Sequence, residues 1–189
     1  MSEMTEALQS IEIWLQNHMP NRAAELKPGI TRDEIDEQVK DLPFSLPDEV
    51  YELYQWHDGS VDMFAVENYD FLSLGSAIAI YHEWLSEALF EEPEEASFFE
   101  KSLPIFQLWS ENGVLLSVVC EESQNYPVRM LDIYCKDFSV RYLSLKDFIL
   151  HVADWYESAQ YYEQDNFWEV EADRESFLAK KYMTNKLIF

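Results

Sequence analysis

Residues 102–144 constrain the fold most, because four stretches typical of β-strands follow one another there with only short turns between them. "SLPIFQLWS" and "VLLSVVCE" flank "ENG". Asn-Gly is a favoured two-residue hairpin turn because both residues tolerate a positive φ. The looser turn "ESQNYP" then leads to "VRMLDIYC", and "KD" leads to "FSVRYLS". Strands joined by such short turns pair antiparallel, so we expect a four-stranded meander.

The N-terminal part has the spacing of helices. Residues 4–19 predict a helix that Pro20 closes, and residues 21–30, which contain a Pro-Gly turn, predict a loop. The apolar face of this helix holds Met4, Leu8, Ile11 and Leu15, and Trp14 widens it. Thr31 and Glu34 have the spacing of a capping box, in which each side chain satisfies a free backbone N–H at the start of a short second helix.

The stretch "SLPDEVYELYQWHDGS", residues 45–60, predicts a third helix. Pro47 suits its first turn, where the missing N–H removes no hydrogen bond. Gly59 is placed to end it in a left-handed conformation. His57 falls on the same helical stripe as Val50 and Leu53, so we interpret it as a structural residue at the helix end.

Shorter elements fill the centre of the chain. Residues 61–66 and 69–74 each predict a strand. Ser73 or Ser76 is placed to cap a helix through about residue 89, whose predicted inward face holds Ile78, Tyr81, Leu85 and Leu89. Residues 91–102, "EEPEEASFFEKS", predict an acidic loop.

The C-terminal part predicts two more helices. Ser144 and Asp147 have the spacing of another capping box, at the start of an amphipathic helix whose apolar face runs from Leu145 to Tyr156. A last helix is predicted over residues 171–183. Helices segregated from antiparallel strands predict an α+β fold. A chain of 189 residues with 48% hydrophobic content is long enough for one domain with a core.

Charge narrows the classes of partner. Thirteen basic residues face 37 acidic ones, which gives a formal net charge of −24. Such a surface repels phosphate groups, so we expect neither direct nucleic-acid binding nor binding to anionic membranes. A basic protein partner is favoured, since opposite charge speeds encounter. The alternative interpretation is that the acidity only keeps the protein soluble.

Other features predict a cytoplasmic protein without a cofactor. No window of about 18 apolar residues occurs, and the acidic start "MSEMTEALQS" lacks the basic and apolar regions of a secretory signal. Cys120 and Cys135 lie in apolar runs without a CxxC spacing. We expect both to be buried free thiols rather than a disulfide or a metal-binding pair.

Four stretches together resemble the SUKH superfamily, the Smi/Knr-type domain. The most specific is "ITRDEIDEQVKDLPFSLPDEVYELYQWHDGS", and the others are "FLSLGSAIAIYHEWL", "LPIFQLWSENGVLLSVVCEE" and "VRYLSLKDFILHVADWYE". The resemblance covers residues 30–158 as a core. It leaves out an N-terminal helix and loop, residues 1–29, and an acidic C-terminal extension, residues 159–189. One departure is His57-Asp58, where the family more often has Asn before the glycine.

The resemblance implies one α+β domain over residues 1–189, with a bent, mostly antiparallel sheet and helices packed around it. It also implies a non-enzymatic role. Many bacterial members look like immunity proteins that bind and neutralise toxins, often nucleases, whereas fungal relatives regulate cell-wall assembly through protein partners. We interpret the chain as immunity-type, directed at a basic, nuclease-like toxin. The alternative is an intracellular scaffold or regulator with a housekeeping protein partner.

The histidines do not form a recognisable catalytic or metal-binding motif. His18, His82 and His151 lie on three separate predicted helices, without an HExxH spacing. His57 and Asp58 are neighbours in sequence, and such neighbours do not face each other on a helix. We therefore predict no catalytic, cofactor-binding or metal-binding residue.

Acidic residues interleaved with aromatic ones are the candidate partner-binding sites. The predicted residues are Glu87, Glu91, Glu92, Glu94 and Glu95 in one segment and Tyr162, Asp165, Trp168 and Glu169 in another. Aromatic side chains are typical anchors of interfaces, and carboxylates steer a basic partner. The alternative is a solvated surface whose aromatic residues belong to the core.

Overall fold

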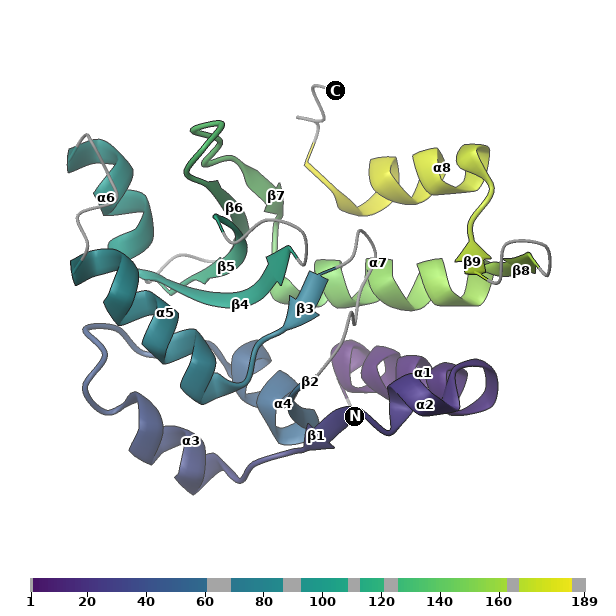
Figure 1. The fold of residues 1–189 in the computed structure, drawn as a ribbon, viewed down its shortest axis with the longest axis horizontal. Coiled ribbons are helices and arrows are strands. Elements are labelled where there is room, and N and C mark those ends of the chain that lie inside the picture. The colour runs from purple at the N-terminus through teal and green to yellow at the C-terminus, as the bar shows by residue number, and fades with distance from the viewer. Residues whose placement is uncertain are drawn as a thin grey trace.

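The strand-rich centre of the chain forms the predicted antiparallel sheet (Figure 1). The structure, a computed structural model, describes residues 2–60, 69–86, 93–108, 113–120, 126–162 and 167–184. Within these residues five strands pair in sequence order: β3 (Tyr69–Phe71), β4 (Ser102–Leu108), β5 (Val114–Val119), β6 (Val128–Asp132) and β7 (Val140–Tyr142). The last four are the predicted meander, and β3 joins it by pairing with β4.

The helices surround this sheet, which confirms the α+β fold. In chain order they are α1 (Glu3–His18), α2 (Pro20–Ala23), α3 (Arg32–Val39), α4 (Asp48–Trp56), α5 (Leu74–Ser86), α6 (Pro93–Glu100), α7 (Leu145–Ser158) and α8 (Ala172–Tyr182). Two separate antiparallel pairs complete the described part: β1 (Leu26–Pro28) with β2 (His57–Ser60), and β8 (Gln160–Tyr162) with β9 (Phe167–Glu169).

The sheet is bent where its register shifts. Between Pro104 and Phe106 one residue of β4 has no partner on β5, and a β-bulge of this kind bends a strand. Because of the extra residue, Ile105 and Phe106 are both fully buried in the same core although they are neighbours in sequence. A second shift lies between Val128 and Arg129 of β6, where that strand meets β7.

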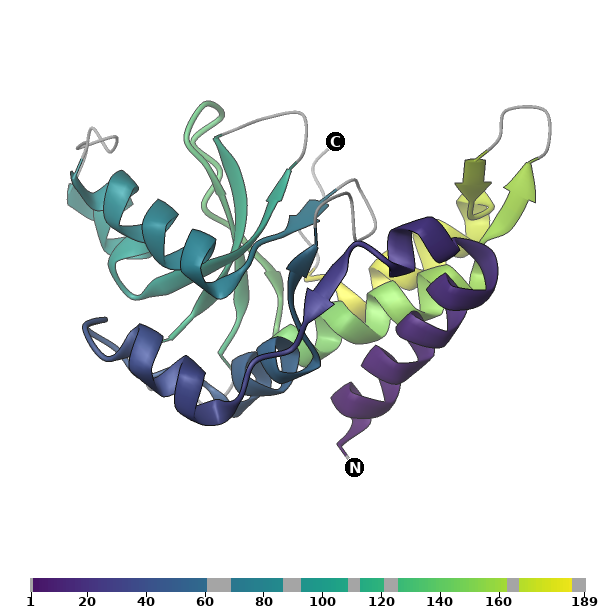
Figure 2. The same ribbon diagram turned by 60° about the horizontal axis from the view of Figure 1, so that its bottom comes forward.

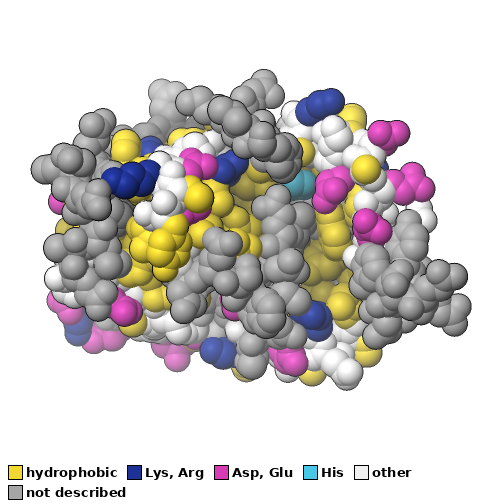
Figure 3. Space-filling view, turned by 45° about the horizontal axis from the view of Figure 1, so that its top comes forward, with side chains coloured by type: hydrophobic (Ala, Val, Ile, Leu, Met, Phe, Trp, Pro, Cys, Tyr) yellow, Lys and Arg dark blue, Asp and Glu magenta, His cyan; other side chains and the backbone are white. Residues whose placement is uncertain are grey.

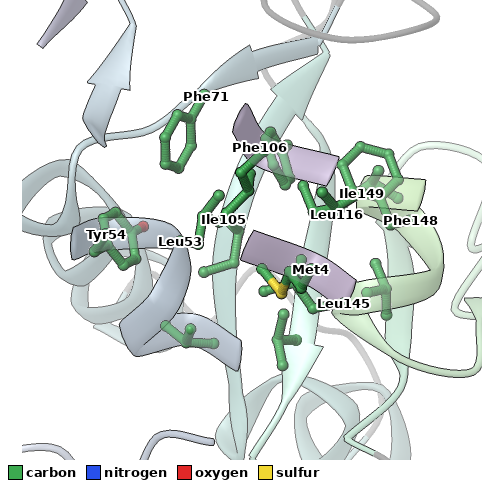
Figure 4. Packing of buried hydrophobic residues seen from close by; sticks show 14 of the residues in the cluster. Met4, Leu53, Tyr54, Phe71, Ile105, Phe106, Leu116, Leu145, Phe148 and Ile149 are labelled. Carbon is green, nitrogen blue, oxygen red and sulfur yellow. The ribbon is translucent and has the colours of Figure 1, made fainter. Parts of the chain in front are cut away.

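Each face of the sheet has its own apolar core. On one face, residues of α1, α4 and α7 pack against β3, β4 and β5, as Figure 4 shows for Met4, Leu53, Phe106, Leu116 and Phe148. On the other face, a smaller cluster joins α5 and α6 to β5 and β6; it consists of Tyr81, Trp84, Phe99, Leu115 and Leu131. The period-2 alternation of β5 produces this division, since Leu115 and Leu116 point to opposite faces.

Helix α7 lies between α1 and α8. Figures 1 and 2 show α1 along one side of it and α8 along another, and both helices contact it. Helix α1 has the predicted apolar face, with Met4, Leu8, Ile11 and Leu15 all at most 2% exposed. Helix α8 is less embedded, since only Leu178 is buried among its residues.

The predicted helix end at Gly59 is wrong. Helix α4 ends at Trp56, and His57 already has extended backbone angles, φ −149° and ψ 146°, because the chain enters β2 there and pairs with β1. Gly59 does have a positive φ of 87°, but it lies inside β2. A Cβ atom at Gly59 would come within 2.6 Å of the Ser73 backbone nitrogen, so glycine permits a close approach of two chain segments.

Several local predictions need a smaller correction. The predicted loop at residues 21–30 contains α2 and β1, and the predicted acidic loop at residues 91–102 contains α6. Helix α5 turns Ala77, Tyr81 and Trp84 inward, whereas Leu85 is 37% exposed. The strand predicted at residues 61–66 and the position Leu89 lie outside the described residues. The β8–β9 pair was not predicted at all.

The cysteine prediction is half right. Both thiols are free, but only Cys120 is buried, and Cys135 is exposed in the turn that follows β6. Burial raises the pKa of the Cys120 thiol to about 12, which keeps it protonated and unreactive at neutral pH.

The packing of α1 yields a first prediction. Ile11 is fully buried and Ile13, on the same helix, is 58% exposed. We expect Ile11→Ala to lower the free energy of unfolding by about 2–5 kcal/mol, because it removes buried methyl groups and leaves a cavity. We expect the matched control Ile13→Ala to change it by less than about 0.5 kcal/mol. Urea denaturation followed by tryptophan fluorescence measures both; equal effects would contradict the docking of α1.

Candidate interaction surface

Exposed carboxylates gather on helices that bury only one residue each. Helix α3 buries Ile35 and leaves its acidic side chains in solvent; these are Asp33, Glu34, Asp36 and Glu37. Helix α8 buries Leu178 and is preceded by Glu171, with Asp173 and Glu175 exposed in its first turn. Figure 3 shows acidic side chains gathered at the α8 side of the face that it views. These helices therefore present negatively charged side chains to any approaching molecule.

Many of the described lysine and arginine side chains form ion pairs within the molecule. The pairs are Arg32 with Asp48 at 3.3 Å, Lys40 with Glu37 at 2.5 Å, Arg141 with Asp137 at 2.6 Å, Lys146 with Glu3 at 3.2 Å, and Lys181 with Asp154 at 2.8 Å. Each pair cancels one acid and one base, so it leaves the excess of acid unchanged. The net charge of −24 is therefore carried by the remaining carboxylates.

The start of α3 is held in place by local chemistry. The Thr31 hydroxyl accepts a hydrogen bond from the Glu34 backbone N–H, and the Glu34 carboxylate accepts one from the Thr31 backbone N–H at 2.8 Å, which confirms the predicted capping box. The Tyr51 hydroxyl of α4 donates to Asp36 at 2.6 Å, and the Arg32 guanidinium lies 4.1 Å from the Tyr51 ring centre. Burial, with this hydrogen bond, raises the pKa of Tyr51 to about 12.

The two predicted partner-binding segments lie far apart. Glu94 and Glu95 belong to α6, whereas Tyr162, Trp168 and Glu169 belong to β8 and β9. Figures 1 and 2 place α6 and the β8–β9 pair at opposite ends of the molecule, so the structure does not bring these residues together. The remaining predicted positions, Glu87, Glu91, Glu92 and Asp165, lie outside the described residues.

Two described aromatic side chains in or next to these segments, Trp168 and Phe99, pack against the rest of the protein. Trp168 is half-buried, with its ring edge-on to Trp14 at 4.7 Å between ring centres and to His18 at 5.1 Å. Phe99 of α6 is fully buried between Tyr81 and Trp84. Trp168 therefore ties β9 to α1, whereas the neighbouring Glu169 is exposed to solvent.

His57 is the residue at the end of α4, as predicted, where its backbone N–H donates to the Leu53 carbonyl oxygen, and its side chain also joins other segments. Its Nδ1 lies 2.7 Å from the Lys27 carbonyl oxygen on β1, and its Nε2 lies 3.9 Å from a carboxylate oxygen of Glu12 on α1. The neighbouring Asp58 accepts a hydrogen bond from the Leu74 backbone N–H at 2.7 Å, so it caps α5. The adjacent pair thus contacts different helices, and both side chains serve the packing of the fold.

His151 is the titratable group that sequence reasoning missed. It lies on the buried face of α7, is 4% exposed, and its Nδ1 is 3.0 Å from the Tyr142 hydroxyl of β7. The Tyr182 ring of α8 stacks on it with 5.7 Å between ring centres. Burial lowers the pKa of His151 to about 4, so the ring is neutral at physiological pH. Its place on the apolar stripe of the predicted helix was the only available signal.

Metal-ligand clusters and membrane-spanning helices are both absent from the described part of the chain. No group of three or more His, Cys, Asp or Glu side chains in those residues is arranged to hold a metal ion. None of the helices formed by those residues is both long enough and apolar enough to cross a bilayer.

Comparison with known proteins adds one match. A family model for the SMI1 / KNR4 family (SUKH-1) matches residues 29–151, which is well over half of the chain. The matched stretch runs from the end of β1 into α7, so it holds α3, α4 and the whole five-stranded sheet. Among curated proteins, no significant match to the chain is found.

His151 yields a prediction about pH. The folded protein keeps the ring neutral down to about pH 4, whereas the ordinary pKa of the side chain is 6.5. Between these values the unfolded chain binds more protons, so stability falls as the pH drops from about 6.5 towards 4. We expect the wild type to lose about 2 kcal/mol more than His151→Gln between about pH 7 and pH 5.

Urea denaturation at both pH values measures this difference. Because carboxylates also titrate in this range, the matched control is His82→Gln, which removes an exposed histidine from α5. The control should keep the pH dependence of the wild type. If His151→Gln and His82→Gln show the same dependence, His151 is not the group responsible.

Proposed function

The chain belongs to the SMI1 / KNR4 family (SUKH-1), and from this membership and its charge we propose that it is a non-enzymatic protein-binding domain of immunity type. In this role it neutralises a basic, nuclease-like toxin by binding it. The observation that carries the proposal is the large excess of acidic over basic residues, a net charge of −24, in a chain that belongs to this family.

The chemistry of a nuclease explains why an acidic protein would inhibit it. An enzyme that cleaves nucleic acid carries positive charge to hold the phosphate backbone of its substrate. Exposed carboxylates of an inhibitor compete with the phosphates for the same positive groups of the enzyme, because they form ordinary ion pairs with them. Helices α3 and α8 each present such carboxylates to solvent. Each helix is anchored to the fold through a single fully buried side chain, so its carboxylates need not be buried.

The contacts of two histidines, His57 and His151, support a role without catalysis. A general base needs a reacting group within reach and a second group that orients it. His57 contacts a backbone carbonyl oxygen and lies near Glu12, whereas His151 is buried under Tyr182. Both rings are engaged in joining one part of the fold to another.

Binding to a purified toxin tests the proposal. The candidate toxin is the product of a neighbouring gene, and isothermal titration calorimetry with the full chain measures its affinity. We expect a complex at submicromolar concentration and inhibition of nuclease activity at equal molar amounts. The absence of a complex at micromolar concentrations would contradict the proposal. Capture of one recurrent endogenous protein from the cell's own lysate would instead favour the scaffold or regulatory role.

A kinetic prediction follows from electrostatic steering. We expect the association rate constant with a basic partner to fall by about tenfold when the ionic strength rises from about 0.01 M to 0.15 M, since the screening length shortens from about 30 Å to 8 Å. The dissociation rate constant should change much less. Stopped-flow fluorescence measures both constants, and an association rate that ignores salt would contradict steering.

Two charge-matched variants locate the steering surface. Asp33→Asn with Glu37→Gln neutralises two exposed acids of α3, and Asp173→Asn with Glu175→Gln neutralises two exposed acids of α8. Each removes two negative charges from a helix that buries one residue. The variant on the side that faces the partner should slow association more, whereas equal effects would indicate that only net charge matters.

A further inference from the structure

A groove of about 530 Å³ lies where the first turns of α4 and α7 meet. Its apolar lining comes from Leu46, Pro47, Tyr126 and Leu143, and its acidic lining includes Asp48 and Asp147. We call it the α4–α7 groove. All of these residues lie within the stretch matched by the family, yet none of them is among the predicted partner-binding residues.

One hydrogen bond between α4 and α7 and one within the start of α7 hold the walls of the groove in place. The Glu49 carboxylate of α4 accepts a hydrogen bond from the Lys146 backbone N–H at the start of α7, at 3.1 Å. The Ser144 hydroxyl accepts one from the Asp147 backbone N–H at 3.0 Å. The first turn of α7 is thus capped from two sides, and the groove is formed before any ligand arrives.

The charge of the groove favours a cation. Two helix N-termini contribute roughly one positive charge between them, which alone would favour an anion. Among the described residues that line the groove, however, Asp48, Glu49 and Asp147 supply three carboxylates against the single ammonium group of Lys146. That ammonium group is also paired with Glu3 at 3.2 Å. The carboxylates therefore outweigh the helix dipoles.

The apolar lining favours a long side chain over a small ion. Leu143 is 55% exposed, and Tyr126, which lines the same groove, is half-buried. Lysine and arginine bury their methylene stems against apolar surface while the charged head stays with polar partners. A groove with an apolar side and an acidic side matches that division.

We propose that the α4–α7 groove binds a lysine or arginine side chain of a protein partner. The proposal rests on the protein-binding function proposed above and names the chemistry by which the partner is recognised. The stem lies along Leu143, Tyr126 and Pro47, and the ammonium or guanidinium group meets Asp48 and Asp147. Asp48 also contacts Arg32 at 3.3 Å with 85% of its side chain exposed, so it exchanges a surface pair for the incoming cation.

Nuclear magnetic resonance with a small probe tests the groove directly. The probe is N-acetyl-arginine methylamide, and the matched neutral probe is N-acetyl-citrulline methylamide, which has nearly the same shape without the charge. We expect the arginine probe at millimolar concentration to shift the backbone amide signals of Asp48, Leu143, Ser144 and Asp147. The citrulline probe should shift them at least about fivefold less, because charge-assisted hydrogen bonds are roughly twice as strong as neutral ones.

Variants of the full chain provide the controls. Asp48→Asn with Asp147→Asn, and separately Leu143→Ser at an exposed position, should each weaken probe binding at least about threefold. The control Asp173→Asn with Glu175→Gln removes the same charge from α8 and should leave the shifts unchanged. Shifts spread equally over α3, α8 and the groove, or equal loss in both double variants, would overturn the proposal.

The toxin experiment separates this proposal from the proposed function. If the toxin binds and Asp48→Asn with Asp147→Asn lowers its affinity by about tenfold or more, both proposals are supported. If the toxin binds and this variant has no effect, the groove proposal fails and the function stands. If the toxin does not bind while the arginine probe shifts the groove signals, the immunity role fails and the groove is retained.

Discussion

The structure depends on the packing of α7 against the sheet. Phe148 lies between two rings of the sheet, 4.8 Å from Phe106 and 5.1 Å from Tyr142 between ring centres. Leu145, Ile149 and Val152 are fully buried on the same stripe. Burying one such side chain contributes about 1.5–3 kcal/mol, so this single helix face contributes several such increments to the apolar stabilisation. Helices α1 and α8 both pack on α7, so their positions follow from it.

Elements whose signals are local could be predicted from the sequence. The meander follows from alternation and the Asn-Gly turn, and α3 follows from the Thr31–Glu34 box. The β2 strand could not be predicted, because its partner β1 lies far away in the sequence and the helical stripe of α4 continues formally to His57. Helix α6 was hidden by an acidic composition that resembles a loop. In each case pairing or packing with a distant segment decided the outcome.

The candidate surface shows the same division. The excess of acidic residues is evident from the sequence. The ion-pair partners of the cations are not, since Lys146 and Glu3, for example, are 143 residues apart. Three of the five ion pairs named above join different helices: Arg32 of α3 with Asp48 of α4, Lys146 of α7 with Glu3 of α1, and Lys181 of α8 with Asp154 of α7. Each exposed pair contributes at most about 1 kcal/mol, yet together they place the few cations where like charges on neighbouring helices would otherwise repel.

This placement links the α1 helix to the charge of the α4–α7 groove. The groove is built from residues inside the stretch that the family matches, whereas Glu3 lies outside it. Glu3 pairs with the Lys146 ammonium group, the only one among the described residues that line the groove, and the same helix buries Met4 and Leu8 against the core. A single helix therefore both packs on the core and adds a further carboxylate next to the groove. Because Glu3 and Met4 are adjacent, the docking of α1 on the core also fixes the position of this added carboxylate, so the charge around the groove depends on α1 as well as on the matched stretch.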